Sequence, residues 1–200
     1  MNNMKKLKYI LSLSLLWIAV SISAQESYVN IQYNMGFPVG NTQDFVDKTS
    51  FRGSSFEFGK YLNDNISVGM GIGWNTFYQS FPKATYPIEG GEITGKKYNY
   101  INAVPIMANV KYHFTREGPI HPYVGLHVGT FYMENRTDIG MYSFADKGWT
   151  FGIAPEAGVA IPVGQGVNFL VSAKYNQSFE TSKIDQQGWF NLNFGISFTF

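Results

Sequence analysis

Residues 189–200 read Trp-Phe-Asn-Leu-Asn-Phe-Gly-Ile-Ser-Phe-Thr-Phe, and apolar residues alternate there with small or polar ones without a break. Phe190 begins the apolar series on even numbers, and Asn191 begins the polar series on odd numbers. Successive side chains of a β-strand face opposite sides, so this segment predicts a strand with one apolar face and one small, polar face. Termini of water-soluble proteins are usually loose and hydrated, so an apolar strand at this position indicates contact with lipid.

Seven further segments show the same alternation, and the clearest is 66–78. Its apolar series runs from Ile66 to Trp74, whereas Ser67 and three glycines make up most of the opposite face. An apolar band about 25 Å tall, crossed at a tilt near 40°, needs roughly 10 residues per strand. The sequence therefore predicts an all-β, eight-stranded antiparallel up-and-down transmembrane β-barrel. The other six segments are 27–38, about 51–62, 98–114, 122–134, 148–161 and 167–180.

The connections between these segments alternate in length. Three are short and rich in turn-forming residues: 63–65, 115–121 and 162–166. Four are long and polar: 39–50, 79–97, 135–147 and 181–188. Bacterial barrels have short periplasmic turns and longer outer loops, so both termini are expected on the periplasmic side. Loops carry much of the recognition on rigid scaffolds, so the longest, 79–97, is the predicted contact site for a surface partner.

Aromatic residues cluster where the two membrane interfaces should lie, as in the girdles of spanning barrels. Pro105 and Pro155 fall inside predicted strands, where a proline removes a ladder donor, so each predicts a local irregularity or bulge. A bulge at Pro105 would let Ile101 and Ala103 face outward. The predicted periplasmic girdle is Tyr28, Tyr61, Tyr112, Phe114, Tyr123, Phe198 and Phe200, and the outer girdle is Trp74, Tyr78, Tyr98, Tyr100, Tyr132, Trp149, Phe179 and Trp189.

Residues 1–24 have the three parts of a cleaved secretory signal. Lysines precede an apolar run from Tyr9 to Ile22, and small residues end at Ala24. That run is shorter than the roughly 20 residues that span a bilayer, and no window of 18 apolar residues occurs later. Residues 25–200 are then one domain, which lacks cysteine and carries a slightly negative charge. This charge balance argues against a nucleic-acid partner, and the lack of cysteine excludes disulfides and a lipoprotein anchor.

Two motifs resemble those of the small eight-stranded outer-membrane β-barrel family, which includes outer-membrane proteins X and W and the barrel domain of outer-membrane protein A. They are Ala-Val-Pro-Ile-Met-Ala-Asn-Val-Lys-Tyr at 103–112 and Phe-Gly-Ile-Ser-Phe-Thr-Phe at 194–200. The resemblance implies a place in the lipid of the bacterial outer membrane. It also implies that the barrel-assembly machinery reads the terminal strand through Phe194, Gly195, Ile196, Phe198 and Phe200. Family members include structural proteins, adhesins and narrow channels.

Parity places five ionisable residues inside the predicted barrel: Glu57, Lys111, His127, Glu156 and Lys174. Isolated buried charges are very costly, so these groups are expected to pair. Eight strands enclose a space that side chains can just fill, which favours a structural ion-pair plug that fixes the register. The alternative is a path for small polar solutes. The room beside inward Gly69, Gly71 and Gly73 would be filled by water or by Tyr61, Tyr123, Phe131 or Met133.

The sequence contains no arrangement typical of an enzyme. Its only imidazoles are His113, His121 and His127, and none belongs to an HExxH or His-x-Ser motif. Glu57 and Glu156 are better explained as ion-pair partners than as catalytic acids, and no cofactor or metal is predicted. The expected role is structural or adhesive at the cell surface. The alternatives are a narrow passive channel and a lipid-modifying enzyme; a soluble lipocalin-type calyx is disfavoured because it needs bulky apolar residues inside.

Overall fold

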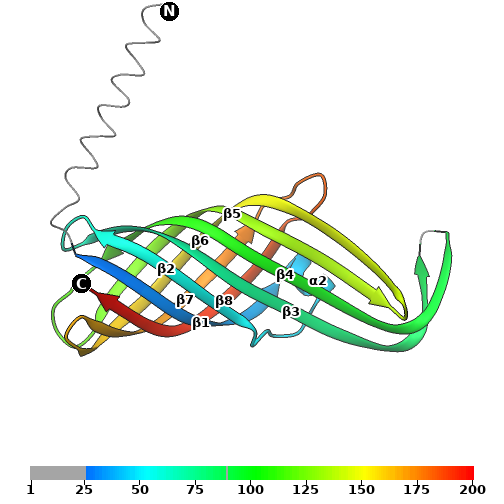
Figure 1. Cartoon of the computed structure of the whole chain (residues 1–200), viewed down its shortest axis with the longest axis horizontal. Helices are drawn as coiled ribbons and strands as arrows, with labels where there is room; N and C mark the ends of the chain where they lie inside the picture. The colour runs from blue at the N-terminus through cyan, green and yellow to red at the C-terminus, as the bar shows by residue number, and fades with distance from the viewer. Residues whose placement is uncertain (1–25, 89) are drawn as a thin grey trace, which may run out of the picture.

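Eight antiparallel strands pair in sequence order and close into a barrel (Figure 1), because β1 pairs with both β2 and β8. The computed structural model describes residues 26–88 and 90–200, so the predicted signal segment 1–24 lies outside the described residues. The predicted fold class is confirmed. The strands are β1 Ser27–Val39, β2 Gly53–Tyr61, β3 Ile66–Ile88, β4 Gly91–His113, β5 His121–Ile139, β6 Tyr142–Gly164, β7 Val167–Ser178 and β8 Gln187–Thr199.

The polarity of the barrel is inverted relative to a water-soluble protein. Ile72 is 48% exposed on the outer surface, whereas Glu156 is only 4% exposed inside. The same alternation occurs on β1, where Ile31 is exposed and its neighbours Asn30 and Gln32 are buried. This arrangement follows from the period of two along each strand, and it confirms the apolar exterior that the sequence predicts. Among the described residues, no helix is long and apolar enough to cross a membrane.

Both ends of the barrel chain meet at one rim. The backbone N–H of Ser27 donates to the carbonyl of Phe200 at 2.8 Å, and the N–H of Phe200 donates back at 2.9 Å. The same rim carries the short connections β2–β3, β4–β5 and β6–β7, the last of which turns at Gly166 with a φ of 66°. Short turns mark the periplasmic end of bacterial barrels, so this is the periplasmic rim.

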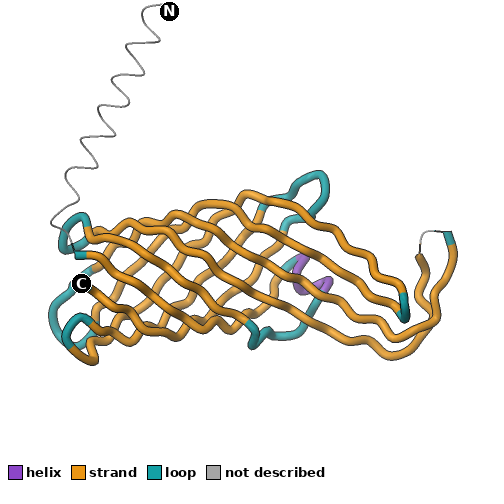
Figure 2. Tube along the Cα trace, in the orientation of Figure 1, coloured by secondary structure: helices purple, strands orange, loops and turns teal. Residues whose placement is uncertain are grey.

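The predicted loops 79–97 and 135–147 are instead strand hairpins that project beyond the rest of the barrel (Figure 2). β3 and β4 stay paired up to Ile88 and Gly91, and β5 and β6 up to Ile139 and Tyr142. β2, the neighbour of β3, begins opposite Asn75, and β7, the neighbour of β6, ends opposite Gly152. The outer parts of β3 and β6 therefore have no paired strand on that side. Cross-strand contacts such as the 2.8 Å hydrogen bond between Thr85 and Thr94 hold the extension, which we call the projecting wall.

The bulge predicted at Pro105 is wrong. Ile72 faces Ile106 and Asn75 faces Ala103 with the same offset, so no residue is inserted between them. Inward parity therefore continues through the proline, and Ile101 and Ala103 are fully buried inside the barrel. The β6–β7 ladder likewise lacks its pairs beside Pro155 but keeps its register on both sides. A proline removes one ladder donor without requiring a change of register.

A single turn of helix, α2 Asn41–Phe45, lies at the outer opening (Figure 2). Thr42 is fully buried and fixes it to β8: its hydroxyl donates to Oε1 of Gln187 at 2.8 Å and accepts from the N–H of Gly188 at 2.9 Å. Loop 40–52 is therefore held over the opening by hydrogen bonds between residues that are 145 and 146 positions apart in the sequence.

Candidate functional site

The five inward ionisable residues lie together in one cluster inside the barrel. Nζ of Lys111 is 2.6 Å from Oε1 of Glu57 and 3.7 Å from Oε2 of Glu156. Glu156 Oε2 also lies 2.6 Å from Nε2 of His127 and 3.7 Å from Nζ of Lys174. Each residue comes from a different strand, β2, β4, β5, β6 or β7, and each is turned inward by strand parity. We call this set the lumen cluster.

Further hydrogen bonds complete the lumen cluster. Asn30 Nδ2 donates to Glu57 at 3.1 Å, and the Tyr123 hydroxyl donates to Glu156 at 3.1 Å. Oxygen and nitrogen atoms of Glu57, His127 and Glu156 lie within 4.8 Å of one another, a spacing that a metal ion could use. The Lys111 ammonium, however, is within ion-pair distance of both carboxylates, so the two acids already have a cation. We therefore assign no metal to the lumen cluster.

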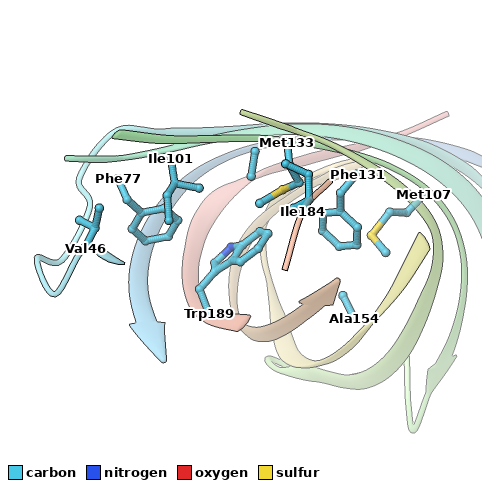
Figure 3. Packing of buried hydrophobic residues seen from close by; sticks show 10 residues of the cluster. Val46, Phe77, Ile101, Met107, Phe131, Met133, Ala154, Ile184 and Trp189 are labelled. Atoms are coloured by element: carbon cyan, nitrogen blue, oxygen red, sulfur yellow. The ribbon is translucent and has the colours of Figure 1, made fainter. Parts of the chain in front are cut away.

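An apolar plug fills the lumen on the outer side (Figure 3). Trp189, which the sequence places in the outer girdle, is fully buried here and packs edge-on against Phe131 and Phe77 at centroid distances of 5.6 and 5.9 Å. Val46 and Ile184 reach the plug from the loops that follow β1 and β7. The complete plug is Val46, Phe77, Ile101, Ala103, Met107, Phe131, Met133, Ala154, Ile184 and Trp189.

Of the four inward side chains that the sequence predicts beside the glycines, Tyr61, Tyr123, Phe131 and Met133, the last two belong to the plug. At the periplasmic end, Tyr28 and Tyr123 both point inward and are each 3% exposed. The inward position was predicted for Tyr123, which was also placed in the girdle, whereas Tyr28 was predicted only in the girdle. They occupy the room left by glycines, since a Cβ at Gly158 would lie 2.8 Å from Cζ of Tyr123, and one at Gly69 would lie 3.1 Å from the Tyr28 hydroxyl. Below them, a vestibule of about 280 Å³ opens to the periplasmic rim.

All three histidines have hydrogen-bond partners. His113 Nε2 lies 3.0 Å from the Ser67 hydroxyl, a pair that the sequence analysis missed because 46 positions separate the two residues. Ser67 is fully buried, and among the described residues no carboxylate forms an ion pair with His113, so the pair lacks the third member of a triad. His121 contacts the carbonyl of Gly118 at 3.1 Å in the turn.

The projecting wall has two different faces. Its inner face forms an apolar groove with one central cation, Lys97, whose ammonium lies 5.1 Å from the Phe81 ring and 5.5 Å from the Tyr86 ring. Its outer face carries tyrosines at the level just above the apolar band. The groove is lined by Tyr86, Pro87, Ile88, Lys97, Thr137, Ile139 and Phe144.

A closed eight-stranded barrel with apolar side chains outside and charges inside defines an integral β-barrel membrane protein. The chain belongs to the outer membrane protein beta-barrel domain family, whose model matches residues 11–198. Its location is therefore the bacterial outer membrane, and its barrel lies in lipid.

Solved structures show the same fold. Neisserial surface protein A has a TM-score of 0.57 at 16% identity, with 89% of this chain and 98% of that chain covered. Ail, the attachment invasion locus protein of Yersinia pestis, was solved with the heparin analogue sucrose octasulfate; its TM-score is 0.52 at 13% identity, covering 88% and 99%. Outer membrane protein OprG from Pseudomonas aeruginosa has a TM-score of 0.53 at 14% identity, covering 88% and 96%. No curated protein sequence matches this chain.

Proposed function

We propose that this protein makes adhesion-like contacts at the cell surface through its projecting wall. The observation that carries the proposal is the groove on the inner face of the wall. This groove lies farther out than the outer ends of β2 and β7. Tyr86, Ile88 and Phe144 give the groove an apolar floor, and Lys97 adds a positive charge. Exposed apolar surface rimmed by polar groups is typical of interaction sites.

The relatives in structure support a contact role. One is an attachment invasion locus protein and was solved with a heparin analogue, and another is a surface protein. We infer that the partner of this chain is likewise a molecule on an opposing surface, with anionic groups for Lys97 and apolar groups for the groove floor.

Attachment of displaying bacteria tests this role. Cells of a non-adherent strain that carry the wild-type chain should bind to a heparin-coated or host-cell surface more than cells with an empty vector. Phe144→Ser, which polarises the groove, should reduce binding to the empty-vector level. Met141→Ser is the matched control, because Met141 is 98% exposed in the same hairpin but does not line the groove. Equal attachment of wild-type and empty-vector cells would refute the proposal.

Two alternatives have their own tests. A passive channel would need a path through both the lumen cluster and the apolar plug, so we expect no conductance in a planar bilayer; steady unitary currents would establish the channel instead. A lipid-modifying enzyme would need an activated and accessible nucleophile, whereas Ser67, the serine that the structure places beside His113, is fully buried. We expect identical lipid A mass spectra from cells with and without the chain.

We further propose how the protein reaches its membrane. Residues 1–24 direct secretion and are cleaved, and the terminal strand around Phe194, Gly195, Ile196, Phe198 and Phe200 is recognised by the barrel-assembly machinery. In support, β8 pairs with β1 from Gly188 to Thr199 and closes the barrel. Amino-terminal sequencing of the mature protein tests the first step.

A further inference from the structure

We propose that the periplasmic vestibule binds a small carboxylated sugar, whose carboxylate pairs with Arg116. The vestibule has a volume of about 280 Å³ and opens at the rim where the two ends of the barrel chain meet. Its inner end is closed by Tyr28, Lys111 and Tyr123, each of which is only 3% exposed. The vestibule is therefore a blind pocket, which can hold a solute without passing it through the barrel.

One wall of the vestibule consists of aromatic rings in mutual contact. The ring centroid of Tyr61 lies 5.4 Å from that of Tyr28 and 5.1 Å from that of His113. The His113 ring in turn lies 5.7 Å from the Tyr123 ring, and all four residues line the vestibule. Small-molecule pockets typically combine such aromatic walls with a few polar groups that orient the ligand. This wall suits the carbon-bound hydrogens on the face of a ligand ring.

The wall formed by β7 and β8 is polar, with Asn168, Ser197 and Thr199 along it. Asn30 of β1 also lines the vestibule and is only 4% exposed. Its Nδ2 donates to Glu57 at 3.1 Å, whereas its Oδ1 is buried without a hydrogen-bond partner among the described residues. A buried acceptor that lacks a donor is costly, so a ligand hydroxyl that donates to Asn30 would remove an existing penalty.

Arg116 supplies the positive charge at the opening. It belongs to the connection between β4 and β5, and its guanidinium carbon lies 3.8 Å from the Tyr61 ring centroid. A guanidinium held on a ring keeps its in-plane N–H groups available for a carboxylate. The other cation of the vestibule, Lys111, is already paired with Glu57 and Glu156. A bound anion is therefore expected at Arg116 rather than at the inner end.

A carboxylate of the protein itself shows where the ligand carboxylate would lie. Oε2 of Glu26 accepts a hydrogen bond from Nη2 of Arg116, although the two residues are 90 positions apart. Among the residues that the structure describes, no other carboxylate lies within ion-pair distance of Arg116. The Glu26 side chain is 56% exposed, and exposed ion pairs contribute little free energy. An incoming carboxylate can therefore replace Glu26, which then turns into water.

The ligand must satisfy three features of the vestibule together. It needs an acceptor for Arg116, a hydroxyl donor for Asn30 and a ring for the wall around Tyr61. A carboxylated sugar has all three, whereas an inorganic anion lacks the ring and a neutral sugar lacks the charge. The vestibule and the projecting wall lie at opposite ends of the barrel (Figure 1), so this inference is independent of the proposed contact function.

Equilibrium dialysis of the full chain, isolated from outer membranes in mild detergent, tests the inference. Radiolabelled glucuronic acid is the probe, and glucose, which has the same ring without the carboxylate, is its matched control. We expect the wild type to bind glucuronic acid about tenfold more tightly than glucose at neutral pH. Arg116→Gln should lose this preference. Glu26→Gln should bind glucuronic acid about two- to fivefold more tightly than wild type, because the internal competitor is removed.

Lys48→Gln is the control variant, because it breaks an exposed ion pair at the other end of the barrel and should bind like wild type. A gel in which the unboiled protein migrates faster than the boiled protein verifies that each variant is folded. Equal binding of the two sugars by wild type, or a preference that persists in Arg116→Gln, would overturn the proposal. Weaker or unchanged binding by Glu26→Gln would overturn it as well, since Glu26 would then not occupy the position of the ligand carboxylate.

Discussion

The ammonium of Lys111 lies 2.6 Å from Oε1 of Glu57, although the residues are 54 positions apart on β4 and β2. The intervening strand, β3, carries Gly69 and Gly71 on its inward face, so no side chain separates the pair. The glycines therefore allow an ion pair to span three strands, and this contact links elements that do not pair through their backbones.

Replacing Lys111 tests the stabilising role that we propose for the lumen cluster. Lys111→Met leaves Glu57 and Glu156 with one fewer cation in a buried site, so the free energy of unfolding should fall by roughly 3–5 kcal/mol. Urea titration in detergent micelles measures the change. Lys48→Met, which breaks an exposed ion pair with Asp47, should cost about 1 kcal/mol or less. Similar costs for the two variants would contradict this role, and a Glu57→Gln/Lys111→Met double variant should recover part of the loss.

Trp189, the buried tryptophan of the apolar plug, should contribute more to the stability of the barrel than an exposed tryptophan. Trp189→Ala removes a fully buried ring and leaves a cavity, so it should destabilise the barrel by about 3–5 kcal/mol. Trp149, 58% exposed towards lipid, is the matched control, and its replacement by alanine should cost less. Unfolding curves of both variants provide the comparison. A larger cost at Trp149 would show that the plug contributes little.

Gly158 is predicted to be intolerant of even one added carbon. A Cβ there would lie 2.6 Å from Cβ of Ser172 and 2.8 Å from Cζ of Tyr123, so Tyr123 would have to move and would lose its hydrogen bond to Glu156. Gly158→Ala should therefore reduce stability by about 1–3 kcal/mol. Gly164→Ala is the control, because open space surrounds that position. The same unfolding midpoint for both variants would disprove the steric argument.

The terminal phenylalanine should affect assembly more than stability. Phe200→Ala keeps the backbone hydrogen bonds to Ser27, and the ring itself is 71% exposed, so refolding in micelles should change little. In cells, the amount of folded protein in the outer membrane should fall several-fold if the assembly machinery reads this residue. Phe58→Ala removes another exposed aromatic ring and should leave assembly intact. Equal losses in the two variants would show that general hydrophobicity matters rather than a terminal signal.

The alternation of residue types was sufficient to predict the barrel, its inverted polarity and the inward side of Glu57, Lys111, His127, Glu156 and Lys174. Charged residues cannot face lipid cheaply, so their parity identifies the interior of each strand. The lumen of an eight-stranded barrel is narrow, so inward side chains at the same level along the barrel axis contact one another. The individual pairings could not be predicted, because they depend on the stagger between strands.

Apolar residues gave less reliable predictions. Trp189 has the same odd parity as Asn191, and Ile101 and Ala103 have the same parity as inward Lys111, so strand parity by itself places all three inside. The outward predictions were wrong because they gave the apolar character of these residues more weight than their parity. The projecting hairpins were missed for a related reason. Proline and glycine in 79–97 are typical of loops, yet Pro82 and Pro87 lie on a strand without a neighbour on one side, where a missing N–H costs nothing.

Because β3 and β6 extend past β2 and β7, the projecting wall ends in two open sheet edges. The β3 edge carries Pro82, Lys83 and Pro87 beside a register shift, features that discourage another strand from adding. The β6 edge at 142–146 contains no proline, and among the described residues no strand pairs with its free side. The projecting wall is thus protected against pairing with another strand only at its β3 edge. We therefore expect a chain that joins the wall by backbone pairing to do so along β6.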